Sequence, residues 1–419
     1  MAAADPEGQA GTYVYDLGVR AGLVMRELVP ELHTQGPQKC YRERANDDVT
    51  GWTIWAAATL LARWVAAHPA VFAGRDVIEL GAGCGLTGLA AACCTPARSV
   101  VLSDYMRETA ENLLWNAARN CARDARAPPL PPTPATVGDG GVVTTAVGDA
   151  LVSAGDTFIS RTGCRVTLSR NDWDEPDTWP RREAGAPAGE AGADAGAAAA
   201  EAAAPGFAQY DIILCADLFY RRSYSRKVAA AVRAMLRPGG VVLVATPTAR
   251  EGLQTLDSMM AAAGFMAAEE AFPAEWRVSP LRPPAPPLGG LLGDLGLSRL
   301  GLAPVDGAAE ALETQLLAAP AAAAGGGAGV GEEEAADDAG VPAGRGVDDA
   351  VVLPLRCART GAPSTPLHFV GAEAARGMFP ELFQPSYAIV RIAYTRNAAA
   401  AAEGDGGGAE PAAGDDALG

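Results

Sequence analysis

The stretch Val77-Ile-Glu-Leu-Gly-Ala-Gly-Cys-Gly-Leu-Thr-Gly88 decides the fold, because a short apolar segment runs directly into closely spaced glycines. The pattern predicts a strand over residues 76–80, a tight turn, and a helix of small residues over 86–94. Glycine adopts positive φ at little cost and lets the backbone approach a ligand, and the following helix offers unpaired N–H groups at its start. Residues 83–88 also satisfy GxGxxG, the dinucleotide fingerprint, so the turn alone does not select one cofactor.

A carboxylate follows the next expected strand, which covers residues 100–103. This residue, Asp104, lies 21 positions beyond Gly83. In an open α/β sheet that position is at the carboxyl edge of the strands, where the carboxylate can accept hydrogen bonds from two ribose hydroxyls. The turn and the carboxylate together predict a site for a cofactor that contains a nucleoside.

Strand and helix patterns alternate on both sides of this site. Further strands are expected over residues 164–168, 210–215, 241–246, 265–271 and 387–394, and helices over 54–67 (with Thr53 as N-cap), 106–121, 223–236 and 251–263. Such alternation favours a parallel sheet with helices on both faces. Because no helix pattern separates the last two strands, we expect that pair to be antiparallel. The prediction is an α/β fold with a Rossmann-like seven-stranded sheet, mostly parallel, whose last strand is antiparallel.

Three tracts, at residues 183–205, 322–350 and 397–419, consist almost entirely of Ala, Gly, Pro and acids. Such tracts cannot bury enough apolar area to offset the entropy of ordering them. They hold sixteen acids against one base, Arg345, and so carry −15 of the net charge of −17. We interpret them as solvated inserts, although an acidic tail could also recruit a basic partner. The chain has no run rich in Lys and Arg, so we expect no nucleic-acid partner.

The cysteines and the N-terminus indicate the compartment. The eight cysteines include no CxxC pair and have no histidine at zinc spacing, so we expect no metal site and a reducing environment. Residues 1–8 carry acids where a targeting peptide has bases. No apolar run approaches the roughly 18–20 residues that cross a bilayer. We therefore expect a soluble protein with no membrane partner, in the cytoplasm or the nucleus.

Six sequence segments together resemble a known family. They are Thr50-Gly-Trp-Thr-Ile-Trp55, the turn quoted above, Leu102-Ser-Asp104, the asparagines at 112, 116 and 120, Trp173, and Tyr210-Asp-Ile-Ile-Leu-Cys-Ala-Asp-Leu-Phe-Tyr220. In this order and spacing they resemble the seven-β-strand (class I) S-adenosylmethionine-dependent methyltransferases, and within them the protein-lysine methyltransferases of methyltransferase family 16. The resemblance covers roughly residues 50–270 and 380–395.

The resemblance implies S-adenosyl-L-methionine as the cofactor and a set of residues that line its pocket. These residues are Trp55, Gly81, Ala82, Gly83, Gly85, Asp104, Asp172, Trp173 and Ala216. The indole of Trp173 can form a flat apolar wall for the adenine, with Asp172 or a backbone group near the exocyclic amine. Two structural alternatives stay open: Trp173 could plug the sheet edge, and Trp55 could belong to the core of its helix.

The residues Asp217-Leu-Phe-Tyr220 resemble the family's Asp-x-x-Tyr/Phe motif, which faces the transferred methyl group. A lysine with a pKa of about 10.4 must attack as the neutral amine, and a carboxylate is too weak a base to deprotonate it efficiently. We therefore expect Asp217 to orient the nitrogen and balance the sulfonium charge, and Phe219 and Tyr220 to hold the alkyl-ammonium group. Alternatively, Asp217 caps the next helix and Tyr220 packs in the core.

The predicted organisation places a methyltransferase domain at residues 50–279 and 377–396. An N-terminal extension covers 1–49, a Pro/Gly-rich insert 124–160, low-complexity inserts 182–208 and 280–376, the last mostly disordered, and a disordered acidic tail 397–419. We expect a monomeric enzyme that methylates a lysine of a protein substrate. Histidine, arginine or small-molecule acceptors remain alternatives, as do an NAD(P)-dependent oxidoreductase, disfavoured because no Tyr-x-x-x-Lys pair is present, and a non-catalytic scaffold.

Overall fold

The computed structural model describes part of the chain, in several ranges. These are residues 11–19, 22–28, 50–123, 157–181, 206–281, 292, 297, 302–318, 350–361, 363–370, 376–384 and 387–396. Most of the expected inserts at 124–160 and 182–208, and the whole expected tail at 397–419, lie outside the described residues. The domain boundaries therefore stay a prediction.

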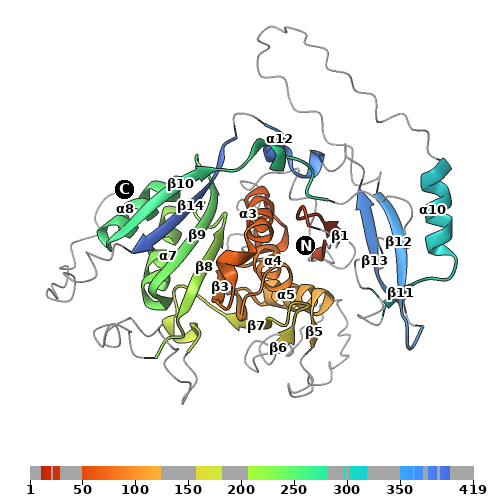
Figure 1. Cartoon of the computed structure of the whole chain (residues 1–419), viewed down its shortest axis with the longest axis horizontal. Helices are drawn as coiled ribbons and strands as arrows, with labels where there is room; N and C mark the ends of the chain where they lie inside the picture. The colour runs from red at the N-terminus through yellow and green to blue at the C-terminus, as the bar shows by residue number, and fades with distance from the viewer. Residues whose placement is uncertain are drawn as a thin grey trace, which may run out of the picture.

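A nine-stranded sheet forms the centre of the molecule, in the order β10-β14-β9-β8-β3-β4-β7-β6-β5 (Figure 1). Its strands are β3 (Asp76–Leu80), β4 (Ser99–Asp104), β5 (Ala122–Arg123), β6 (Thr157–Ile159), β7 (Arg165–Arg170), β8 (Tyr210–Ala216), β9 (Leu236–Pro247), β10 (Phe265–Ala271) and β14 (Ile389–Arg396). The five strands from β7 to β9 are parallel, whereas β14 is antiparallel to both β9 and β10. The α/β fold and the antiparallel last strand are confirmed. The sheet exceeds the predicted seven strands because β5 and β6 add an antiparallel edge beside β7.

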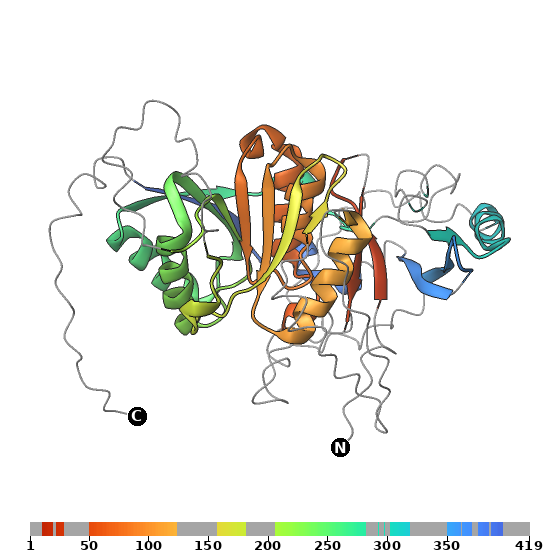
Figure 2. The same cartoon turned by 90° about the horizontal axis from the view of Figure 1, so that it is seen from below.

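Helices cover both faces of this sheet (Figure 2). They are α3 (Ala56–Ala67), α4 (Leu86–Cys94) and α5 (Arg107–Asn120) on one face, and α7 (Arg222–Met235) and α8 (Glu251–Ala262) on the other. Successive residues of a strand point to opposite faces, and accordingly Val77 packs in the first core and Ile78 in the second. The prediction that Thr53 is the N-cap of α3 is wrong. Trp55 precedes α3, and the Thr53 hydroxyl donates instead to the buried Glu27.

A second, five-stranded sheet has the order β11-β12-β13-β1-β2. Its strands are β1 (Gly11–Tyr15), β2 (Leu23–Glu27), β11 (Leu302–Pro304), β12 (Ala350–Cys357) and β13 (Pro363–Val370), accompanied by helix α10 (Ala308–Ala318). Its core includes Leu353, Leu355, Leu367 and Phe369. No pattern in the sequence predicted this sheet, and residues 280–376 were expected to be mostly disordered. The alternation of these apolar residues is short and lies within long Ala/Gly-rich surroundings, which obscured it.

The asparagines of α5 join the hairpin of β1 and β2 to the nine-stranded sheet. Asn112, Asn116 and Asn120 are spaced by four residues and therefore share one face of the helix. The amide of Asn120 accepts from the Val24 N–H (2.9 Å) and donates to the Val24 carbonyl (2.8 Å). Asn116 bonds Arg26 in the same way, at 2.7 and 3.1 Å. The helix thus satisfies the edge of β2 much as a neighbouring strand would.

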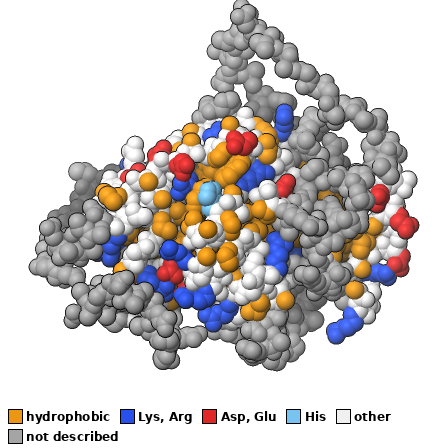
Figure 3. Space-filling view, in the orientation of Figure 1, with side chains coloured by type: hydrophobic (Ala, Val, Ile, Leu, Met, Phe, Trp, Pro, Cys, Tyr) orange, Lys and Arg blue, Asp and Glu red, His pale blue; other side chains and the backbone are white. Residues whose placement is uncertain are grey.

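The surface of the described residues is mixed. Hydrophobic, basic and acidic side chains are interspersed over the face seen in Figure 3. Within the described ranges, no helix combines the length and the apolar character required to cross a membrane.

Candidate functional site

One cavity gathers the residues that follow the carboxyl ends of β3, β4, β7 and β8. Of the predicted site residues, all but Phe219 line it: Trp55, Gly81, Ala82, Gly83, Gly85, Asp104, Asp172, Trp173, Ala216, Asp217 and Tyr220. The reason is topological, because parallel strands present their carboxyl ends at one edge of the sheet, where open α/β folds bind ligands. The structure brings these residues together, and their individual roles stay predictions.

The turn between β3 and α4 requires glycine for two reasons. Gly81, Gly83 and Gly85 have φ of +57°, +53° and +84°, a left-handed region that other residues rarely adopt. A Cβ on Gly81 would also lie 2.6 Å from the Leu218 side chain. Asp104 secures this turn, since its Oδ2 accepts from the Gly83 N–H at 2.9 Å. The predicted carboxylate therefore shapes the loop in addition to facing the cavity.

Glu79 is a cavity residue that the sequence analysis missed. Its Oε2 accepts a hydrogen bond from the Gly88 N–H at 2.8 Å, and the residue is buried at the end of β3. Burial, aided by the charge of Asp104, raises the pKa of the Glu79 carboxyl to about 8 against the opposing hydrogen bonds from Gly88 and Thr87. At neutral pH this carboxyl is thus largely protonated. The available signal was a carboxylate between the apolar residues Ile78 and Leu80 of the strand.

Aromatic rings form one wall of the cavity. The ring of Tyr224 meets Trp173 edge-on, with 5.7 Å between centroids, and meets Tyr220 edge-on at 5.1 Å. Tyr224, on α7, was not predicted. Trp55, which also lines the cavity, donates its Nε1 hydrogen to the Thr50 carbonyl at 2.9 Å, and the Thr50 hydroxyl lies 3.3 Å from the hydroxyl of Tyr220. The aromatic residues of the two predicted motifs therefore enclose one space.

Two expectations about the loop after β8 are wrong. Phe219, expected to hold the alkyl-ammonium group, is 0% exposed and packs in the core, and its carbonyl accepts from the Gly252 N–H at 3.0 Å. The alternative in which Asp217 caps the next helix fails as well. Arg221 precedes α7, and no side-chain hydrogen bond caps that helix. Tyr220 is half-buried and lines the cavity rather than the core.

Asp217 is held by a cation that the sequence analysis also missed. Arg250 donates from Nε to Oδ1 at 2.8 Å and from Nη2 to Oδ2 at 2.7 Å, a two-point contact between side chains that are 16% and 6% exposed. Asp217 has φ of +54°, and its N–H donates to the Ala245 carbonyl of β9 at 2.9 Å. Because β8 and β9 are adjacent and parallel, the residues after their carboxyl ends meet.

Buried polar atoms test whether a nucleoside cofactor fits. The Thr109 hydroxyl, both amide atoms of Asn171 and the Trp173 Nε1 are buried without a hydrogen-bond partner among the described residues. All three residues line the cavity. Leaving a buried donor or acceptor unpaired costs about 1–3 kcal/mol, and the hydroxyls, ring nitrogens and amine of a nucleoside could satisfy such atoms. The residues fit the expected cofactor. No cluster of potential metal ligands occurs within the described part of the chain.

Comparisons with known proteins match one segment of the chain. Residues 39–128 match a family model described as lysine methyltransferase. The protein-lysine N-methyltransferase EEF2KMT of Bos taurus is 45% identical over 71 residues, which cover 17% of this chain and 21% of that protein. The calmodulin-lysine N-methyltransferase of Arabidopsis thaliana is 45% identical over 62 residues, covering 15% and 20%. The chain thus spans about a fifth of the length of these curated relatives.

A search of solved structures adds a methyltransferase from Pyrococcus furiosus. It is 14% identical, with a TM-score of 0.30, over 51% of this chain and 76% of that one. The family model is more specific than the structural match, because it names lysine methyltransferases. Its matched segment includes the glycine turn, Asp104 and the asparagine face of α5. In its residues 39–128 the chain therefore resembles the lysine methyltransferase family, and that family implies S-adenosyl-L-methionine as the methyl donor.

Proposed function

We propose that this chain is an S-adenosyl-L-methionine-dependent methyltransferase that modifies a lysine side chain of another protein. One observation carries the proposal. The glycine turn and Asp104, which lie in the family-matched segment, share a single cavity with Asp217 and Tyr220. A cofactor surface and an acceptor surface thus adjoin.

The cofactor side is suited to a nucleoside with a charged sulfur. The bound cofactor would supply a methyl group on a positively charged sulfur. Asp104 would accept bonds from the ribose, and the indole of Trp173 would lie against the adenine. Thr109 and Asn171 offer further hydrogen-bonding atoms in the same cavity. The largely protonated Glu79 adds little charge there at neutral pH.

The acceptor side must receive a neutral amine. At pH 7 a lysine ammonium loses its proton at a cost of about 5 kcal/mol. A carboxylate is too weak a base to remove it efficiently, so the proton passes to solvent and Asp217 orients the nitrogen. The faces of Tyr220 and Tyr224 provide aromatic contact for the alkyl-ammonium chain. The names of the matched relatives support lysine over histidine, arginine or a small molecule.

The compartment and assembly state belong to the same proposal. Within the described ranges the cysteines at positions 84, 93, 94, 121, 164 and 215 are free thiols. Free thiols are typical of a reducing compartment, which supports a cytosolic or nuclear enzyme. We infer that it acts as a monomer on its protein substrate.

Cofactor choice is the direct test of this function. Calorimetric titration of the full chain with S-adenosylhomocysteine should give saturable binding, and titration with NADH should give none. Binding of NADH without S-adenosylhomocysteine would replace the proposal with an oxidoreductase. Binding of S-adenosylhomocysteine without methyl transfer to any lysate protein would favour a non-catalytic scaffold.

A further inference from the structure

The negative charge of Asp217 is already matched before any acceptor arrives. Arg250 contacts both carboxylate oxygens, at 2.7 and 2.8 Å, in a partly enclosed setting. Two parallel N–H···O bonds between a guanidinium and a carboxylate fix geometry as well as charge. The carboxylate that faces the acceptor therefore forms part of a neutral pair.

The structure holds Arg250 firmly in this place. The Arg250 N–H donates to the Pro247 carbonyl at the end of β9, and Arg250 directly precedes α8. Gly252, two residues later, packs so closely that a Cβ would lie 2.6 Å from the Phe219 carbonyl oxygen. The Ser225 hydroxyl of α7 donates to the Gly252 carbonyl at 2.7 Å. The start of α8 is thus fastened to the loop that carries Asp217.

The pairing matters because the acceptor must be neutral when it reacts. In methyl transfer the amine lone pair forms the N–C bond while the C–S bond breaks and its electron pair stays on sulfur. The proton of the ammonium must leave for solvent before that step. An unpaired carboxylate beside the nitrogen would stabilise the ammonium form and hold this proton. A carboxylate paired with a guanidinium can orient the nitrogen with much less of that penalty.

We propose that Arg250 is a positioning residue that acts through Asp217 and keeps the acceptor amine easy to deprotonate in the site. The inference rests on the proposed function, because it concerns the acceptor of that reaction. Arg250 itself need not touch the acceptor or the cofactor.

Other charged and titratable groups surround the pair and are compatible with this role. Tyr387 lies just before β14, and the charges of both Arg250 and Asp217 affect its pKa. The charge of Glu381, on α12 (Pro380–Phe383), raises that pKa as well. Burial raises the pKa of Tyr387 to about 12, so this phenol stays neutral over the working range.

Elsewhere on the cavity wall lie Glu79, Asp104 and Tyr220, together with Lys227, which bonds Asp174 on the rim. The charges of these groups also affect the pKa of an amine in the cavity, so the test must separate the effect of Arg250 from theirs. A variant that changes only the Arg250–Asp217 pair does so, provided that cofactor binding is unchanged.

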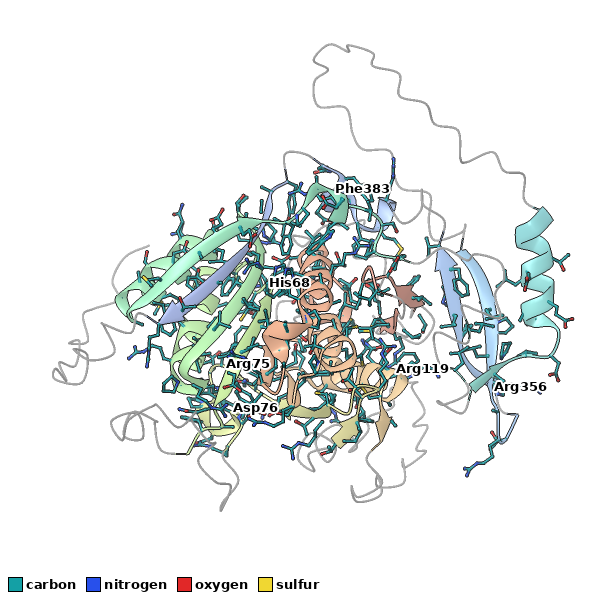
Figure 4. All side chains as sticks on the ribbon, in the orientation of Figure 1. His68, Arg75, Asp76, Arg119, Arg356 and Phe383 are labelled. Atoms are coloured by element: carbon teal, nitrogen blue, oxygen red, sulfur yellow. The ribbon has the colours of Figure 1, made fainter. Side chains whose placement is uncertain are left out.

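The test uses Arg250→Gln and Arg250→Lys, with Arg237→Gln as a matched control. Asp217 follows the carboxyl end of β8, and Asp211 lies near the amino end of that strand. Arg237 pairs with Asp211 at 2.6 Å. That edge is marked in Figure 4 by Asp76, which Arg237 also contacts. Removing the Arg237 charge perturbs a comparable ion pair away from the cavity.

The first measurement uses NMR at pH 7. It determines the affinity of n-butylamine for the protein loaded with S-adenosylhomocysteine. This probe carries the lysine head group. Arg250→Gln should bind the ammonium about tenfold more tightly, because about one pKa unit corresponds to a tenfold change in protonation. Arg250→Lys, which keeps the charge, should stay near wild type. Arg237→Gln should match wild type.

The pH dependence of kcat on the lysate protein that wild type methylates is the second measurement. The kcat profile reports ionisations in the bound complex, whereas kcat/KM reports those of the free species. For Arg250→Gln the kcat profile should move about one unit to higher pH while KM falls. Without the carboxylate, the loss of Arg250 should have no such effect. The double variant Asp217→Asn/Arg250→Gln should therefore show the same n-butylamine affinity and the same kcat profile as Asp217→Asn.

The outcomes separate the two proposals. Wild type that fails to bind S-adenosylhomocysteine would refute the function and, with it, the role of Arg250, because no acceptor amine would then react at this site. Wild type that binds the cofactor, with Arg250→Gln showing wild-type n-butylamine affinity and an unshifted kcat profile, would refute the role of Arg250 alone. A change of equal size in Arg237→Gln would also overturn it, because the effect would then be a general loss of structure.

Discussion

Replacing Glu79 with glutamine should change how the stability of the fold depends on pH. The carboxyl is buried at the end of β3, where burial first and the charge of Asp104 raise its pKa from an ordinary 4.5 to about 8. Glutamine has the same shape and keeps an oxygen that can accept the Gly88 N–H bond. The substitution thus removes the ionisation while preserving the contact.

The sign and size follow from proton linkage. Between pH 4.5 and about 8 the folded protein holds a proton on Glu79 that the unfolded chain has released. A group whose folded pKa is raised contributes fully below its unfolded pKa, and that contribution is lost as pH rises through the folded pKa. At 1.36 kcal/mol per unit, and with the slope falling off as pH approaches the folded pKa, the loss between pH 6 and pH 8 is about 2 kcal/mol.

Urea unfolding at pH 6, 7 and 8 measures this effect in wild type and Glu79→Gln. The stability of the variant relative to wild type should increase by about 2 kcal/mol from pH 6 to pH 8. Glu269→Gln on β10, where the side chain is exposed, is the control and should follow wild type. Parallel pH dependences for Glu79→Gln and wild type would refute the buried, proton-binding carboxyl.

Two further substitutions test the site and its support. Asp104→Ala should weaken S-adenosylhomocysteine binding in calorimetry by about 2 kcal/mol, because charge-assisted bonds to the ribose are lost; unchanged affinity would remove that role. Asn116→Ala deletes hydrogen bonds to both Arg26 and Cys84 and should lower the free energy of unfolding by about 2–4 kcal/mol. A loss below about 1 kcal/mol in urea unfolding would contradict the strand-like pairing of α5 with β2.

Local patterns in the sequence predicted the parts of the fold that depend on near neighbours. The strand at Asp76–Leu80, the helix at Leu86–Cys94 and the strand at Phe265–Ala271 have the expected bounds. The first two have strong apolar patterns that end at Gly81 and before Pro96, and the third lies between the breaks at Gly264 and Pro273. Most of the cavity residues were predicted from the family resemblance, and the topology explains why they meet, because strand ends in a parallel sheet share one edge.

The missed features depend on pairing between distant segments. Arg250 lies 33 residues beyond Asp217 and meets it only because β8 and β9 are neighbours. Glu79 looks like one polar residue in a strand until its burial is known. The asparagines of α5 were visible as a motif, yet their partner is the backbone of a hairpin some 90 residues earlier in the chain. Spacing within one element carries no information about such contacts.

The most direct test of the account is methyl transfer itself. Full-length protein is incubated with lysate proteins and S-adenosylmethionine that carries a labelled methyl group, and the labelled proteins are hydrolysed in acid to identify the modified amino acid. The account predicts labelled methyl-lysine with wild type and a steep loss with Asp217→Ala, although that variant still binds S-adenosylhomocysteine. Equal labelling by wild type and Asp217→Ala, or label found on an amino acid other than lysine, would contradict it.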